Sequence, residues 1–147
     1  EKLKELGADY AVDHRKDDWH KEVRAITKEI VKLNGGSPGI DVIFEHIGGS
    51  HFNKELTLLK YGSTMVTTGA TTGYDAPADL RHIFFKGINI LGSTQGTRAE
   101  LEEGFHWMGQ GKIKVIIDSV FTFENAVDAH EKMLNGKGLV GKIIIKP

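Results

Sequence analysis

The stretch GIDVIFEHIGGSHFNKELTLLKYGSTMVTTGATTG, residues 39–73, decides the fold of this chain. It predicts a strand over residues 40–44, a helix over residues 50–59 and a second strand over residues 64–68. Both strands are rich in apolar and β-branched residues, and both run into small residues that include glycine. Apolar strands that alternate with helices indicate an α/β fold with a parallel sheet covered on both faces. Ligands of such sheets bind beyond the carboxyl ends of the strands, so we expect a ligand at these glycine-containing ends.

The same alternation extends along most of the chain. A third strand is predicted over residues 88–94, and it also ends in small residues. Helices are predicted where apolar residues recur at helical spacing or where a capping residue begins a helical segment. The remaining elements expected up to residue 112 are a helix over residues 1–6 ended by Gly7, a short strand over 10–13, a helix over 19–33, a helix over 80–86 capped by Asp79, and a helix from Thr97 to Met108 with Glu100 in a capping box.

Past residue 112 the alternation loosens. A strand is predicted over residues 115–121, a helix over 123–134 and a last strand over 139–145. This segment is expected to pack back against the rest of the protein.

Composition argues against several classes of partner. The 147 residues carry a net charge of -1 with no block of like charge, which is unlike a protein that binds nucleic acid or an anionic membrane. No apolar run approaches the roughly 20 residues that a membrane helix needs. The chain has no cysteine, which excludes disulfides and thiolate zinc sites and makes the cytoplasm the expected compartment.

The residues themselves predict a binding cleft and no catalytic group. None of the seven histidines has a partner at a spacing typical of metal ligands, so no metal site is predicted. His46 differs from the others because it follows the strand at 40–44. We expect it to line a cleft, and simple packing is the alternative. A nucleophile elbow, a phosphate-binding P-loop and a dinucleotide glycine fingerprint are all missing from the sequence.

Five segments resemble the C-terminal part of the medium-chain dehydrogenase/reductase superfamily, which includes zinc-type alcohol dehydrogenases and quinone oxidoreductases. They are ELGADYAVDH, GIDVIFEHIGG, YGSTMVTTGATTGYDA, INILGSTQGTRAEL and GLVGKIIIKP, and their order and spacing match over essentially the whole chain. FEHIG also resembles the FEHPG of crotonyl-CoA carboxylase/reductases. The resemblance implies a partial Rossmann-type sheet, strands three to six, over residues 1–112. Residues 113–147 would then return to a GroES-like catalytic domain that the chain does not include.

The resemblance also implies a dinucleotide at the ends of the last three of these strands. The end of strand four would border the adenosine side, and the ends of strands five and six would present backbone groups to the nicotinamide carboxamide. Lys142 would reach the pyrophosphate, and a solvated lysine is the alternative. The other implied cofactor-binding residues are His46, Ile47, Gly48, Thr68, Gly69, Ala70, Ser93, Thr94 and Gln95.

The implied parent enzyme uses NAD or NADP to move hydride to or from an alcohol, aldehyde, quinone or enoyl substrate. Zinc is compatible with such a parent, but this chain holds no ligands for it. The chain begins without methionine, inside what reads as a helix, and lacks the glycine turn that binds the pyrophosphate, so we expect a piece that is inactive alone. A homo-oligomer is expected through strand six. A stand-alone nucleotide-binding or dimerisation module without catalysis is the rival hypothesis.

Overall fold

The computed structural model describes residues 2–136 and 138–147 of the chain. Its internal contacts divide it into two compact units. One unit is Gly7–Gln95, and the other combines the N-terminal residues up to Leu6 with Gly96–Pro147. Each unit is described by itself. The domain boundary expected at residues 112 and 113 concerns the domains of the parent enzyme, and it stays a prediction.

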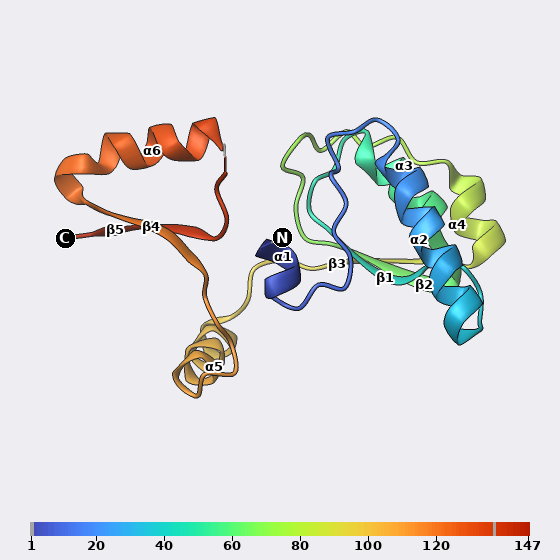
Figure 1. Ribbon diagram of the computed structural model, residues 1–147, viewed down its shortest axis with the longest axis horizontal. Coiled ribbons are helices and arrows are strands. Elements are labelled where there is room, and N and C mark those ends of the chain that lie inside the picture. Colours follow the sequence, from blue (N-terminus) through green and yellow to red (C-terminus); the bar gives the residue numbers. More distant parts are fainter. Residues whose placement is uncertain (1, 137) are drawn as a thin grey trace. The chain divides into compact units, whose positions relative to one another are not determined.

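The unit Gly7–Gln95 contains a parallel three-stranded sheet with helices between its strands (Figure 1). The strand order is β1-β2-β3, so β2 is central and β3 is an edge. This arrangement confirms the α/β class and the parallel sheet expected from residues 39–73. In chain order the elements are α2 (Trp19–Asn34), β1 (Ile40–Glu45), α3 (His51–Leu58), β2 (Leu59–Thr67), α4 (Leu80–Lys86) and β3 (Asn89–Gly92).

Local signals set where several of these elements begin and end. The Asp79 side chain accepts a hydrogen bond from the N–H of Arg81 and so caps α4 as predicted. Gly87 ends the same helix in the left-handed conformation, which glycine adopts at low cost. The predicted turn near Gly62 lies within β2 as an irregularity, because residues 60–63 lie opposite Asp41 alone in the β1–β2 register.

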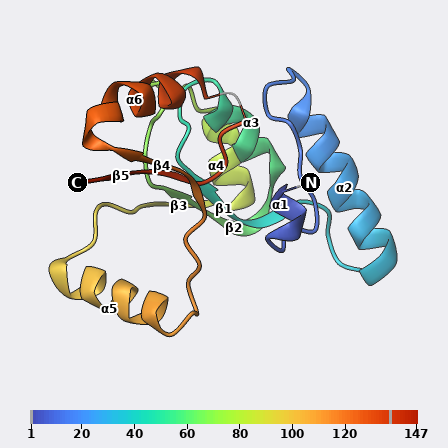
Figure 2. The same cartoon turned by 60° about the vertical axis from the view of Figure 1, so that its left-hand side comes forward.

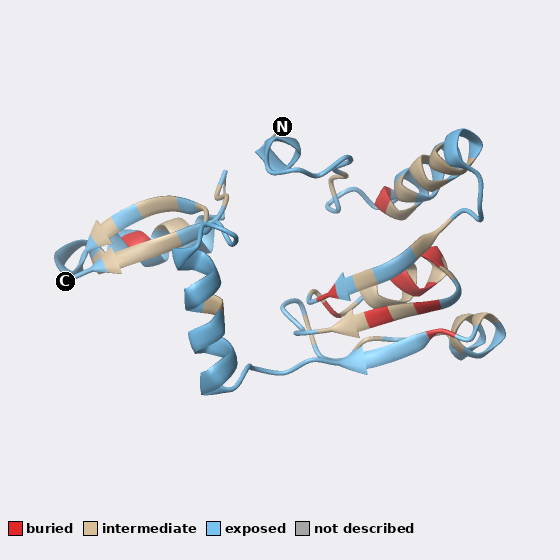
Figure 3. Cartoon of the chain, turned by 90° about the horizontal axis from the view of Figure 1, so that it is seen from below, coloured by how far each residue is buried: buried red, intermediate tan, exposed pale blue. Residues whose placement is uncertain are grey.

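The core lies between the sheet and its helices. Met65 of β2 is fully buried, and α3 and α4 pack on its side of the sheet while α2 packs on α3. Figure 3 shows the buried residues concentrated in α3 and in the central strand. The core cluster consists of Leu56, Leu59, Met65 and Ile88, with Ile43, Phe52, Ala78 and Ile83 packed against it.

The face of this sheet opposite the helices is exposed, although the sequence predicted a sheet covered on both faces. Alternation along β1 turns Phe44 away from the helices, and its side chain is 75% exposed. In Figure 1 α3 and α4 lie above β1–β3, and α2 packs on α3. The expected cover on both faces is therefore wrong for this unit, because its own three helices supply only one layer.

The strand expected over residues 10–13 does not form. A strand needs a hydrogen-bonded neighbour, and within residues 2–136 and 138–147 no other segment pairs with this one. The three strands that do form match strands four to six of the implied Rossmann order. The missing pairing partner is thus the physical reason that strand three is not present.

The second unit is built on a parallel pair of strands. The strands β4 (Ile117–Thr122) and β5 (Lys142–Lys146) pair, and α6 (Ala126–Asn135) packs along both, as Figures 1 and 2 show. Asp118 of β4 accepts a hydrogen bond from the N–H of Val140, just before β5, and forms an ion pair with Lys132 of α6.

The same unit holds three further elements, α1 (Lys2–Glu5), α5 (Arg98–Gly109) and the 3-10 helix η1 (Phe123–Asn125). The predicted capping box of α5 is present, with Thr97 and Glu100 each accepting a hydrogen bond from the other's backbone N–H. In the part of the chain that the structure describes, every helix is too short or too polar to cross a bilayer.

Candidate functional site

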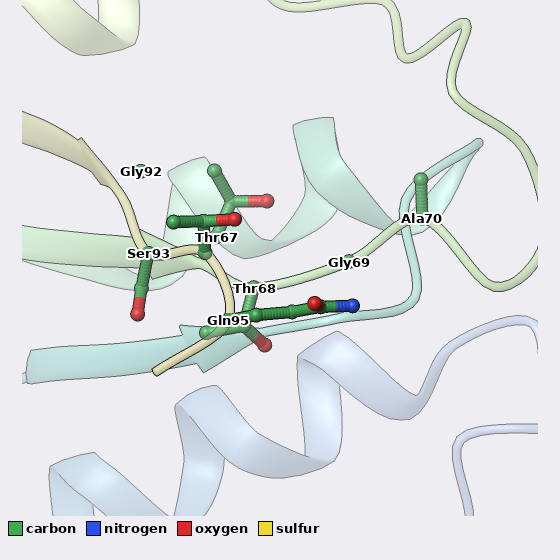
Figure 4. Close-up of a pocket in the computed structure, with 8 residues that line it drawn as sticks. Thr67, Thr68, Gly69, Ala70, Gly92, Ser93 and Gln95 are labelled. Carbon is green, nitrogen blue, oxygen red and sulfur yellow. The ribbon is translucent and has the colours of Figure 1, made fainter. Parts of the chain in front are cut away.

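A hollow opens where the carboxyl ends of β2 and β3 lie side by side (Figure 4). Its volume is about 690 Å³. Parallel sheets bind ligands at this end of their strands. Six of the residues expected to bind a cofactor line the hollow, together with Thr67 and Gly92. The six are Thr68, Gly69, Ala70, Ser93, Thr94 and Gln95.

The lining of the hollow is polar and uncharged. Its side chains offer four hydroxyl groups and the amide of Gln95. In Figure 4 the Gln95 side chain extends along the hollow in the direction of Gly69 and Ala70. A primary amide donates and accepts hydrogen bonds at once, so this lining suits a neutral polar group such as a carboxamide.

The backbone at the hollow is only partly engaged within the protein. The N–H groups of Thr68 and Ser93 continue the sheet, donating to the carbonyl oxygens of Glu45 (2.8 Å) and Thr67 (2.9 Å). The backbone N–H groups of the two residues that follow Thr68, and of the two that follow Ser93, have no acceptor within the part of the chain that the structure describes. They are the N–H groups of Gly69, Ala70, Thr94 and Gln95. These N–H groups beside an uncharged hollow are available to a ligand that accepts hydrogen bonds.

The loop after β1 is fastened to the chain that follows β2. The N–H groups of Thr71 and Thr72 donate to the carbonyl oxygens of His46 (3.1 Å) and Ile47 (2.8 Å), and Gly49 donates to Gly73 (2.9 Å). The hydroxyl groups of Thr71 and Thr72 donate to the same two carbonyl oxygens at 2.9 Å each. Both hydroxyl groups are therefore used within the protein.

The three residues predicted to border the adenosine side lie in this loop and not in the hollow itself. His46 is exposed, Ile47 is half-buried and Gly48 is buried. Gly48 has a φ of 72° and lies directly against the backbone of Gly73 and Ala70. A side chain at this position would collide with that backbone, so the close approach of the two loops depends on glycine.

Glu45 is the functional residue that sequence reasoning missed. It ends β1, is only 2% exposed, and its carboxylate turns back onto its own loop. One carboxylate oxygen accepts from the N–H groups of Ile47 (2.6 Å) and Gly48 (2.5 Å), and the other accepts from the Thr67 hydroxyl (3.1 Å). A signal was available, because an acidic residue that ends an apolar strand and shares a face with Ile43 must lie toward the core.

A second carboxyl group is buried near Glu45, on the helix α3. Glu55 of α3 is 8% exposed, and its Oε2 has no hydrogen-bond partner among the described residues. Burial, and then the nearby charge of Glu45, raises the pKa of Glu55 to about 7. Glu55 therefore holds its proton for much of the time at neutral pH.

Comparison with known proteins places this geometry in a family. A family model described as zinc-binding dehydrogenase matches residues 6–145. The chain belongs to the zinc-binding dehydrogenase family. Membership confirms the resemblance to medium-chain dehydrogenases and reductases that the five sequence segments carry.

Named relatives of this zinc-binding dehydrogenase chain are oxidoreductases. It is 32% identical over 133 residues to quinone oxidoreductase of Pongo abelii. This match covers 86% of this chain and 39% of the relative. It is 30% identical over 139 residues to crotonyl-CoA reductase of Streptomyces collinus, covering 92% and 30% of the two chains. A solved NAD-dependent alcohol dehydrogenase superposes with a TM-score of 0.79 at 29% identity, covering 99% and 40%. The chain thus spans 40% or less of the length of each of these three proteins. The superposition on the alcohol dehydrogenase confirms the partial Rossmann-type fold.

Lys142 belongs to the other compact unit, Gly96–Pro147 with the N-terminal residues. It begins β5, its side chain is exposed, and its N–H donates to the carbonyl oxygen of Ile116 at 2.8 Å. Its role toward the pyrophosphate stays a prediction.

The family description names zinc. Within residues 2–136 and 138–147, no group of three or more histidine or carboxylate side chains could hold a metal ion. The described residues therefore do not fit a zinc centre.

Proposed function

We propose that this chain is the dinucleotide-binding part of an NAD(P)-dependent oxidoreductase, and that the hollow receives the nicotinamide end. One observation carries the proposal: an uncharged hollow at the ends of two parallel strands, with four backbone donors that have no acceptor among the described residues. The relatives named as oxidoreductases and the superposition on an NAD-dependent alcohol dehydrogenase support it.

In this proposal the residues of the chain bind and orient. One or two of the N–H groups of Gly69, Ala70, Thr94 and Gln95 would donate to the oxygen of the carboxamide, and the side-chain oxygen of Gln95 would accept from its NH₂ group. The loop of His46, Ile47 and Gly48 would border the adenosine. When bound, the nicotinamide ring supplies hydride transfer at its C4. The strand ends hold that ring in one orientation, which is the contribution that proximity makes to catalysis.

Substrate, metal and compartment are proposals about the parent enzyme. The names of the relatives support an alcohol, aldehyde, quinone or enoyl substrate. Any zinc would be held by residues outside this chain, and the cytoplasm is the proposed compartment. The chain alone would be inactive, because the glycine turn for the pyrophosphate is not part of its sequence.

Binding of NADH and NADPH to the full-length parent tests the proposal directly. An open reading frame that continues upstream of Glu1 into a glycine-rich turn would encode the protein to be tested. Titration followed by nicotinamide fluorescence should show saturable binding of one or both dinucleotides. Failure of both to bind would refute the proposed function and favour a module without a dinucleotide.

Lys142 provides a prediction for the same parent. We expect Lys142→Ala to weaken dinucleotide binding by about 1.5–3 kcal/mol, the usual value of a hydrogen bond to a charged group. That loss corresponds to a roughly ten- to 150-fold rise in the dissociation constant. Isothermal titration measures it, and Lys146→Ala, at the exposed far end of β5, is the matched control. Equal dissociation constants for wild type and Lys142→Ala would leave the lysine without a role at the pyrophosphate.

A second prediction concerns self-association through strand six, which is β3. Every residue of β3 is exposed, and Ile90 and Leu91 give this edge an apolar surface. Ile88 does not contribute as expected, because it is buried in the core. We propose a two-fold contact through β3. Ultracentrifugation at micromolar concentration should show a dimer that Ile90→Lys converts to a monomer of 16.2 kDa.

The control for this prediction is Leu101→Lys, an exposed apolar residue on α5. It should leave the dimer intact. A wild-type chain that sediments only as a monomer would rule the contact out.

A further inference from the structure

A buried carboxylate joins the strand ends that carry the proposed dinucleotide site. We propose that Glu45 is a positioning residue: its carboxylate fixes the loop after β1 and the end of β2 in the arrangement that the dinucleotide meets. This inference rests on the proposed function, and it assigns a role to a residue that does not itself line the hollow.

The first part of the argument is the contact with the loop. A single oxygen of Glu45 accepts from two successive N–H groups, Ile47 at 2.6 Å and Gly48 at 2.5 Å. Hydrogen bonds to an ionised acceptor are shorter and stronger than neutral ones, and both distances are shorter than those of ordinary N–H···O hydrogen bonds. Gly48 is buried, so its N–H would have no water to replace a lost acceptor. The carboxylate therefore determines the path of the loop.

The second part is the link from β1 to the hollow. The other carboxylate oxygen accepts from the Thr67 hydroxyl at 3.1 Å, and Thr67 lines the hollow. The carbonyl oxygen of Thr67 in turn accepts from the N–H of Ser93 at 2.9 Å. The main chain of Glu45 adds to this, because its carbonyl oxygen accepts from the N–H and the hydroxyl of Thr68. Glu45 thus connects, directly or through one residue, the ends of all three strands.

The chemistry explains why the residue is a glutamate. Three donors converge on its side chain, and only an ionised carboxylate accepts at both oxygens with no donor of its own. Glutamine would keep the size but place an NH₂ group toward one set of donors. Alternation along β1 puts this side chain on the same face as Ile43, beneath the helices, where its charge is paired only by hydrogen bonds.

The first experiment measures the loop contact without any cofactor. In the ¹⁵N-labelled 147-residue chain, the amide protons of Ile47 and Gly48 should resonate far downfield, as charge-assisted donors do. Glu45→Gln should move both upfield, together with the amide of Ser93. Glu55→Gln is the matched control, because it makes the same change at a second buried glutamate of this layer and should leave the Ile47 and Gly48 resonances in place.

The second experiment measures the consequence for binding in the full-length parent. Glu45→Gln should raise the dissociation constant for NADH or NADPH at least tenfold, while Glu55→Gln leaves it within twofold. Thr67→Val removes the hydroxyl link to Glu45 together with one hydroxyl group of the hollow, and it should raise the constant by a smaller factor without moving the Ile47 and Gly48 amides. If Glu45→Gln fails to fold, the dissociation constant of Thr67→Val tests the positioning role of Glu45.

The outcomes separate the two proposals. Amide resonances of Ile47 and Gly48 that ignore Glu45→Gln would overturn the loop contact. Shifted amides with an unchanged dissociation constant for Glu45→Gln and Thr67→Val would overturn the positioning role. A wild-type parent that binds neither dinucleotide would instead overturn the proposed function, and the amide shifts would still decide whether Glu45 holds the loop.

Discussion

Replacing Glu55 with glutamine is expected to increase the free energy of unfolding of this chain by about 3 kcal/mol at pH 8 and to leave it unchanged at pH 4. Burial in α3 and the charge of Glu45 raise the pKa of Glu55 from 4.5 to about 7 in the folded chain. Between pH 4.5 and about pH 7, Glu55 keeps a proton in the folded state that it has released in the unfolded state. The contribution of Glu55 to wild-type stability therefore falls as the pH rises from 4.5 to about 7, and it levels off above pH 7. Glutamine resembles the protonated carboxyl group and removes the cost.

Urea unfolding of both proteins at pH 4, 6 and 8 measures this difference. Other groups titrate over the same range, but they are common to both proteins and cancel in the comparison. Glu29→Gln, on the exposed face of α2, is the matched control and should show no such pH-dependent gain. Stability curves for wild type and Glu55→Gln that run parallel from pH 4 to pH 8 would mean that Glu55 titrates as an ordinary surface carboxylate.

Gly48→Ala is the second change with a large expected effect, a loss of about 2–5 kcal/mol of stability. Gly48 has a φ of 72°, a conformation that costs an alanine about 1–2 kcal/mol. The new methyl group would also overlap the carbonyl oxygen of Gly73 and lie 3.2 Å from the Cα of Ala70. Forcing these two loops apart adds about 1–3 kcal/mol. Thermal and urea unfolding measure the loss, and dinucleotide binding by the full-length parent should weaken with it.

Gly62→Ala separates the two causes of that loss. Gly62 has a φ of 70°, but a Cβ there would meet nothing within 4 Å. It should therefore show the conformational cost alone, about 1–2 kcal/mol. If Gly48→Ala costs no more than Gly62→Ala, the contact between the loops after β1 and β2 contributes nothing to stability.

The sequence by itself determined the elements whose causes are local. The apolar, β-branched run at 40–44 forms β1, and Asp79 caps α4 through a donor two residues away. Thr97 and Glu100 form their capping box within one helical turn. The segments that resemble medium-chain dehydrogenases carried the family as well, because their order along the chain is itself sequence information. The same ends of strands that the pattern marked as ligand sites come together in one hollow.

Only the tertiary structure decided the features that depend on distant partners. Residues 10–13 have the composition of a strand, but no strand forms because the chain offers them no neighbour to pair with. Ile88 and Ile90 look alike in sequence, yet Ile88 is buried in the core cluster with Leu56 and Met65, and Ile90 is exposed on the edge strand β3. Glu45 becomes the link between strand ends through Thr67, 22 positions along the chain. Burial and strand pairing depend on contacts between segments that are far apart in the chain. A local pattern of residues does not specify which distant segment will make those contacts.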